Sequence, residues 1–103
     1  MHRLFLLLFL VGLAFSSASA QTENHTVSGY VTDSLTGETL IGANVVILED
    51  ETRGTTTNTY GFYSLKLPAG RYTLRISYLG YAEQRIPIDL REEDQRINVA
   101  LLE

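Results

Sequence analysis

Between Thr26 and Leu101, apolar side chains recur at every second position in short runs, which is the period of β-strands that present one face to a core. The seven runs are residues 26–32, 43–48, 53–58, 63–67, 72–78, 86–90 and 97–101. No segment of this region has apolar side chains at helical spacing over more than one turn, so helix is not expected. Seven short strands separated by turn residues predict an all-β fold, a sandwich of two sheets.

The residue types within the runs predict where each strand lies. The run 43–48 is more apolar than alternating, which suits a strand covered on both faces. The threonine-rich run 53–58 and the run 86–90, which contains Pro87, are expected at sheet edges. Tyr63 and Leu74 have the inward parity of their runs and should lie in the core.

Glycine, proline and small polar residues mark the expected reversals of the chain. The residues that we expect to form turns and core are Gly29, Asp33, Gly42, Asn58, Gly61, Tyr63, Leu65, Pro68, Gly70, Leu74, Gly80 and Tyr81. The connection of residues 68–70 is short enough to make its flanking runs an antiparallel hairpin, with Gly70 at a positive φ. Asp33 should cap the turn that follows it.

The first twenty residues have the three parts of a secretory signal peptide. A basic start at residues 1–3 precedes twelve apolar residues, 4–15, and small residues that end with Ala18 and Ala20. Twelve apolar residues are too few for a membrane-spanning helix, which needs about 20. The sequence therefore predicts cleavage between Ala20 and Gln21, a polar tail over residues 21–25 and one domain over residues 26–103.

The chemistry available to the remaining chain is narrow. Without Arg3 there are seven Lys and Arg against twelve Asp and Glu, a net charge of −5, which argues against binding of nucleic acid or anionic lipid. Cysteine is absent and His25 is the one histidine after residue 20, so we expect no nucleophile–histidine pair, catalytic residue, metal or cofactor. The acidic runs 49–51 and 92–94 lack the spacing of a calcium loop and are expected at exposed hairpin tips.

Four residues leave alternatives open at the surface. Asn24 starts an N-x-Thr sequon and Ser34 follows Asp33 as a bacterial O-glycan acceptor, and the sequence leaves open whether either carries a glycan. Tyr30 and Phe62 have the opposite parity to the core residues and are expected on the surface, where they hint at a contact surface.

An ordered series of motifs resembles a known family. The motifs are residues 27–33, 37–45, 54–57, 61–65, 67–70 and 77–81. They resemble the carboxypeptidase regulatory-like domain, in the variant that follows the signal peptide of TonB-dependent outer-membrane receptors of Gram-negative bacteria. The resemblance implies a seven-stranded antiparallel two-sheet sandwich of the transthyretin type, without catalysis. The family usually has aspartate where this chain has Asn58, which keeps the turn chemistry but removes a charge.

The resemblance also implies a location and partners. The mature chain would lie in the periplasm or on the periplasmic face of the outer membrane, without a transmembrane span, beside the plug and barrel of a receptor or other envelope proteins. It would be a stand-alone module or a fragment of a receptor. Two other hypotheses remain: an accessory folding domain of a secreted metallocarboxypeptidase, and a carbohydrate-contacting adhesin, which Tyr30 and Phe62 motivate.

Overall fold

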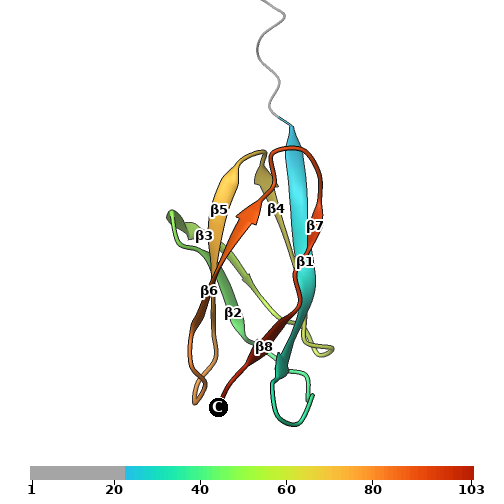
Figure 1. The fold of residues 1–103 in the computed structure, drawn as a ribbon, viewed down its shortest axis with the longest axis vertical. Helices are drawn as coiled ribbons and strands as arrows, with labels where there is room; N and C mark the ends of the chain where they lie inside the picture. The colour runs from blue at the N-terminus through green and yellow to red at the C-terminus, as the bar shows by residue number, and fades with distance from the viewer. Residues whose placement is uncertain (1–22) are drawn as a thin grey trace, which may run out of the picture.

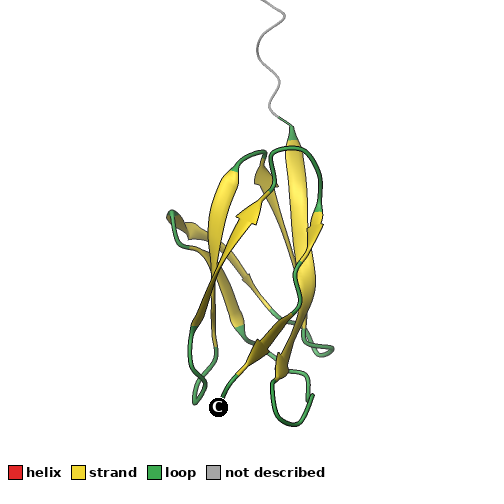
Figure 2. Ribbon diagram, viewed as in Figure 1, coloured by secondary structure: helices red, strands yellow, loops and turns green. Residues whose placement is uncertain are grey.

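The computed structural model of this protein describes residues 23–103, which form two β-sheets packed as a sandwich (Figures 1 and 2). The strands are β1 (Asn24–Asp33), β2 (Asn44–Ile47), β3 (Asp50–Thr56), β4 (Phe62–Pro68), β5 (Arg71–Ser77), β6 (Gln84–Asp89), β7 (Gln95–Arg96) and β8 (Val99–Leu101). The predicted all-β, two-sheet fold is confirmed. The predicted cleavage site at Ala20 and Gln21 lies outside the described residues.

The first sheet is built around β1, and the second has the order β3-β2-β5-β6. β4 pairs antiparallel with one side of β1, whereas β7 and β8 pair parallel with its other side. All pairs of the second sheet are antiparallel. The last predicted run, residues 97–101, contains only β8, and the extra strand β7 precedes it. Both strands pair parallel with β1, where the sequence predicted one antiparallel strand. As predicted, β3 and β6 are edge strands.

The predicted hairpin at residues 68–70 is wrong. β4 pairs with β1 and β5 pairs with β2 and β6, so the connection crosses from one sheet to the other. The crossing is held where the Ala69 N–H donates to the Glu23 carbonyl (2.8 Å) and the Gly70 carbonyl accepts from the Leu90 N–H (2.8 Å). Gly70 does not have a positive φ. A hairpin turn and a short connection between two sheets can both be flanked by strands with alternating apolar residues. The sequence pattern therefore did not distinguish them.

The core lies between the two sheets. Its buried apolar residues are Val27, Val31, Leu40, Ala43, Val45, Ile47, Tyr63, Leu67, Leu74, Ile76, Ile88, Leu90, Val99 and Leu101. Tyr63 and Leu74 are buried as predicted, and Leu65 is half-buried against the same cluster. Burial raises the pKa of Tyr63 to about 12.

Two strands differ from the expected burial or extent. β2 is buried at Val45 and Ile47, but Asn44 is exposed, because in a two-layer sandwich each sheet has a solvent face. β1 begins at Asn24 and includes His25, which the sequence assigned to a polar tail. Pairing with β4 recruits these polar residues, and His25 Nδ1 lies 2.6 Å from the Leu90 carbonyl oxygen. Within residues 23–103, no helix is long and apolar enough to cross a membrane.

Candidate functional site

The break between β7 and β8 lies against Gly29 in the middle of β1. A Cβ atom at Gly29 would be 1.9 Å from the Ile97 carbonyl oxygen, which occupies the inward position beside the strand. The same oxygen accepts a 2.7 Å hydrogen bond from the Tyr63 hydroxyl. Gly29 therefore has a packing role rather than a turn role: only glycine leaves room for this close approach of backbone.

Side chains provide partners for β1 in two places where its parallel ladder is absent, before β7 and between β7 and β8. Asp94 Oδ1 accepts from the Thr26 N–H (2.8 Å), and Asn98 Oδ1 accepts from the Tyr30 N–H (3.0 Å). The sequence placed Asp94 in an acidic run expected at an exposed hairpin tip and revealed neither contact. The ladder along this side of β1 is thus completed by two polar side chains.

The solvent side of the first sheet carries an aromatic pair. Tyr30 and Phe62 are direct cross-strand neighbours on β1 and β4, with ring centroids 5.2 Å apart in an edge-to-face arrangement. The Arg96 guanidinium lies 5.7 Å from the centroid of the Phe62 ring, within the range of a cation–π contact. Tyr30 is exposed, as predicted, and Phe62 is half-buried. We call Tyr30, Phe62, Lys66 and Arg96 the aromatic–cation face.

The two cations of this face differ from the other basic residues of the domain. The five remaining arginines all pair with carboxylates on or beside the second sheet: Arg53 with Asp50, Arg71 and Arg91 with Asp89, Arg75 with Glu51 and Glu83, and Arg85 with Glu83. Within residues 23–103, neither Lys66 nor Arg96 has a carboxylate in salt-bridge range. The arginines on or beside the second sheet are paired with carboxylates of the same domain, whereas the two cations of the aromatic–cation face are not.

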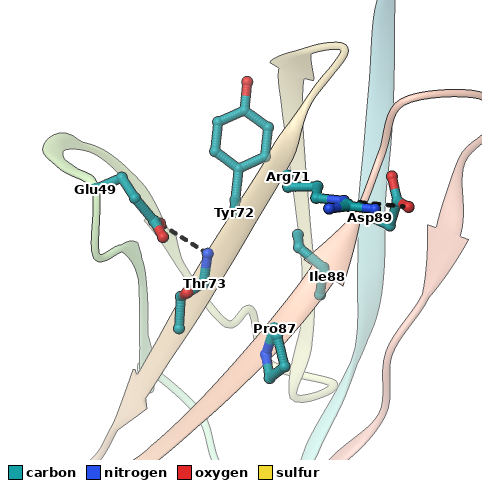
Figure 3. Close-up of a pocket in the computed structure, with 7 residues that line it drawn as sticks. All are labelled: Glu49, Arg71, Tyr72, Thr73, Pro87, Ile88 and Asp89. Atoms are coloured by element: carbon teal, nitrogen blue, oxygen red, sulfur yellow. Dashed lines mark hydrogen bonds and ion pairs between the residues drawn. The ribbon is translucent and has the colours of Figure 1, made fainter.

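A shallow groove of about 340 Å³ lies at the end of the second sheet between β5, β6 and the β2–β3 turn (Figure 3). Its polar groups already have partners: Glu49 Oε1 accepts from the Thr73 N–H (2.7 Å), and Arg71 lies 3.8 Å from Asp89. The Thr73 N–H lowers the pKa of Glu49, and hydrogen bonds from Arg91 lower that of Asp89 to about 2. The groove therefore offers a ligand fewer free groups than the aromatic–cation face.

The two acidic runs lie in different settings. Residues 49–51 form the tip of the β2–β3 hairpin and the start of β3, close to the prediction. Residues 92–94 lie in the connection from β6 to β7, which crosses between the sheets and is not a hairpin tip. In the part of the chain that the structure describes, no three metal-ligating side chains come together.

Asn58 and Gly61 build the turn that places Phe62 on this face. Asn58 Oδ1 accepts from the N–H groups of Tyr60 (2.9 Å) and Phe62 (3.1 Å), so the amide oxygen does what a carboxylate oxygen would do. Gly61 has φ +73°, and a Cβ atom there would be 2.8 Å from Thr39 Cβ. Gly42 and Gly80 also have positive φ and lie in exposed turns, as expected of glycine there.

Asp33 caps the turn after β1, as predicted, and also holds a distant loop. Its Oδ1 accepts from the N–H groups of Leu35 (2.8 Å) and Thr36 (3.0 Å). Its Oδ2 accepts from the Tyr81 hydroxyl (2.7 Å), a partner that the sequence did not reveal. The Tyr81 hydroxyl, followed by the two backbone N–H groups, lowers the pKa of Asp33, and the same hydrogen bond raises the pKa of Tyr81 to about 12.

We expect Tyr81→Phe to raise the pKa of Asp33 and to destabilise the protein more at pH 7 than at pH 2. A carboxyl whose pKa is lowered by folding stabilises the fold above its unfolded pKa of about 3.8, and that contribution is lost as the pH falls through the folded value. NMR titration of the Asp33 carboxyl and urea unfolding at both pH values measure this. Tyr78→Phe is the control, because no partner of the Tyr78 hydroxyl is found among the described residues. An unchanged Asp33 titration in Tyr81→Phe would contradict the assignment.

Comparison with protein families identifies the type of domain that this sandwich represents. The model of the CarboxypepD_reg-like domain family matches residues 27–103. The TonB-dependent receptor SusC of Bacteroides thetaiotaomicron is 39% identical over 82 residues, which cover 80% of this chain and 8% of the receptor. The TonB-dependent receptor P3 of Formosa agariphila is 35% identical over 85 residues, which cover 82% of this chain and 8% of the receptor. The chain thus matches a small part of the length of these relatives.

Solved structures share the sandwich at lower sequence identity. A cohesin–X-dockerin complex from Acetivibrio cellulolyticus matches with a TM-score of 0.63 and 23% identity, over 76% of this chain and 56% of that one. Catechol 1,2-dioxygenase of Acinetobacter radioresistens matches with a TM-score of 0.65 and 14% identity, over 84% of this chain and 54% of that one. At such identities the likeness concerns the fold alone.

Proposed function

The chain belongs to the carboxypeptidase regulatory-like domain family, and from that premise we propose that it is an exported, non-catalytic accessory domain of a TonB-dependent outer-membrane receptor. The similarity to two such receptors over about four-fifths of the chain carries the proposal. The family is one of regulatory-like domains rather than of catalytic ones. The domain would contribute to a receptor as a folded module beside its plug and barrel.

The arrangement of polar groups supports a role as a scaffold. The carboxylate and amide oxygens of Asp33, Asn58, Asp94 and Asn98 all accept backbone N–H groups, where they complete turns and the β1 ladder. Groups engaged in this way stabilise local structure and are not poised to abstract or donate a proton. The arrangement therefore favours a domain that presents a surface.

We propose that the chain acts in the periplasm or on the periplasmic face of the outer membrane. The basic start, apolar run and small residues at positions 1–20 support export. The two TonB-dependent receptors that resemble the chain support an envelope location.

Export can be tested by intact mass. After expression of the full chain in a Gram-negative host, the protein recovered from the periplasmic or outer-membrane fraction should begin at Gln21, because Ala18 and Ala20 occupy the positions that signal peptidase requires. An Ala20→Arg variant should retain the first twenty residues and serves as the uncleaved control. Recovery of the unprocessed chain in the cytoplasm would contradict the proposed location.

A further inference from the structure

We propose that the aromatic–cation face is a docking surface for an acidic, extended polypeptide segment of another protein, which lies along β4 with carboxylates against Lys66 and Arg96. The inference does not depend on the proposed receptor: a domain of any envelope protein could carry such a surface. It rests on the charge of the face, the open edge of β4 and the aromatic pair Tyr30 and Phe62.

The two cations of the face are free to pair with carboxylates from outside the chain. Every Asp and Glu of the sequence lies within residues 23–103, and none of them reaches Lys66 or Arg96 in a salt bridge. Asp94 lies on the same side of β1 as Arg96, two residues before it, but its Oδ1 accepts from the Thr26 N–H and it forms no salt bridge with Arg96. A domain with an excess of acidic residues thus keeps two cations unneutralised on one side, and an acidic partner is the one that they favour.

The edge of β4 offers main-chain groups beside Lys66. Arg96 lies on β7, across β1, and its guanidinium reaches toward β4 at the Phe62 ring. On the side away from β1, the Phe62 N–H donates to Asn58 Oδ1 and the Phe62 carbonyl accepts from the Asn58 N–H. On the β1 side, the Gly61 carbonyl accepts from the Val31 N–H. Because antiparallel pairing alternates along a strand, the N–H and C=O groups of Ser64 and Lys66 also point away from β1. β4 is an edge strand, so these four groups face an open edge that ends at Pro68.

An open edge favours a polypeptide over a glycan as the occupant. An extended segment can donate to and accept from alternate residues of an edge strand, which is the geometry of β-strand addition. Lys66 on this edge opposes pairing with the same edge of a second copy, because two lysines would face each other. Tyr30 and Phe62 add exposed aromatic area next to Arg96, and aromatic residues and arginine are enriched in protein interfaces.

The proposal can be tested with a synthetic peptide of alternating residues, N-acetyl-Glu-Val-Glu-Tyr-Glu-Val-Glu-amide, titrated into the exported chain and followed by NMR. We expect saturable binding that weakens with salt, and shifts concentrated at the amides of Tyr30, Ser64 and Lys66. A double variant, Lys66→Gln with Arg96→Gln, should weaken binding about 2-fold to 30-fold, as expected for the loss of two exposed ion pairs. Both side chains are exposed, so the variant should fold.

The matched control removes the same charge from the second sheet. Arg53→Gln with Arg85→Gln should leave the peptide affinity within about twofold. Equal weakening by both double variants would show that only net charge matters and would overturn the proposal, as would the absence of saturable peptide binding. Tighter binding of maltoheptaose or polygalacturonate at the same amides would assign the face to glycans. Self-association in sedimentation that Lys66→Gln with Arg96→Gln abolishes would assign it to a second copy.

Discussion

Gly29→Ala should destabilise the protein by at least about 3 kcal/mol, the upper range of what overpacking costs in a core. The added methyl group would lie 1.9 Å from the Ile97 carbonyl oxygen, and that oxygen is held by the Tyr63 hydroxyl and by the parallel pairing of the flanking strands. Backbone on both sides leaves little room to relax. Since a domain of this size has about 4–12 kcal/mol in total, the variant should unfold at a much lower urea concentration or fail to fold.

Two further variants keep this prediction testable if Gly29→Ala does not fold. Tyr63→Phe removes the hydroxyl but no carbon atom, leaves the Ile97 carbonyl without its partner and should cost about 1–3 kcal/mol. Gly70→Ala is the control: Gly70 lacks a positive φ, and the nearest neighbour of its new Cβ would be the Tyr72 hydroxyl oxygen, at 3.3 Å. It should change stability by about 1 kcal/mol or less. If Gly29→Ala were as stable as the wild type, the close approach of the Ile97 carbonyl to Gly29 would be contradicted.

Leu74→Ala should cost about 2–5 kcal/mol, because it removes most of a fully buried side chain from the middle of the second sheet. Leu74 lies opposite Ile47 on β2 and Ile86 on β6, so the cavity would open between three strands. Urea unfolding followed by circular dichroism measures the loss. The dependence of the unfolding free energy on urea should match that of the wild type if Leu74→Ala also unfolds in two states.

Thr73→Ala provides the comparison, one residue away on the solvent side of the same strand. Its side chain is half-buried beside the groove, and the hydrogen bond from its backbone N–H to Glu49 survives the substitution. It should cost about 1 kcal/mol or less. Comparable losses in Leu74→Ala and Thr73→Ala would contradict the inward orientation of Leu74.

Alternation along single strands was enough to predict the fold class and most of the core. A one-residue shift moves a side chain to the other face, so the parities of Tyr63, Leu74 and Tyr30 followed directly from their runs. Glycines in turns were also predictable at Gly61 and Gly80, because few other residues tolerate a positive φ.

Pairing between strands could not be predicted in the same way, because it depends on which sheet each strand joins. The connection at residues 68–70 has the length and composition of a hairpin but crosses between sheets. The parallel pairing of β7 and β8 with β1 involves residues far apart in the sequence. The close approach of Ile97 to Gly29 accompanies that pairing and lies at the gap between β7 and β8.

The aromatic–cation face was partly predictable. Tyr30 and Phe62 were expected on the surface from parity, but their contact depends on the register of β1 and β4. The lack of a salt-bridge partner for Lys66 and Arg96 depends on where all twelve acidic residues lie, and no local pattern contains that information. Likewise, Tyr81 reaches Asp33 across 48 positions of sequence.

Peptide mapping of the endogenous polypeptide that carries residues 23–103 tests the proposed function most directly. An antibody against these residues would isolate it from the outer-membrane fraction of the organism that encodes it, and mass spectrometry would identify all covalently linked and associated sequence. We expect peptides from the plug and barrel of a TonB-dependent receptor, in the same chain or in the same complex. Peptides from a secreted peptidase, or recovery of the domain outside the cell without any receptor, would contradict it.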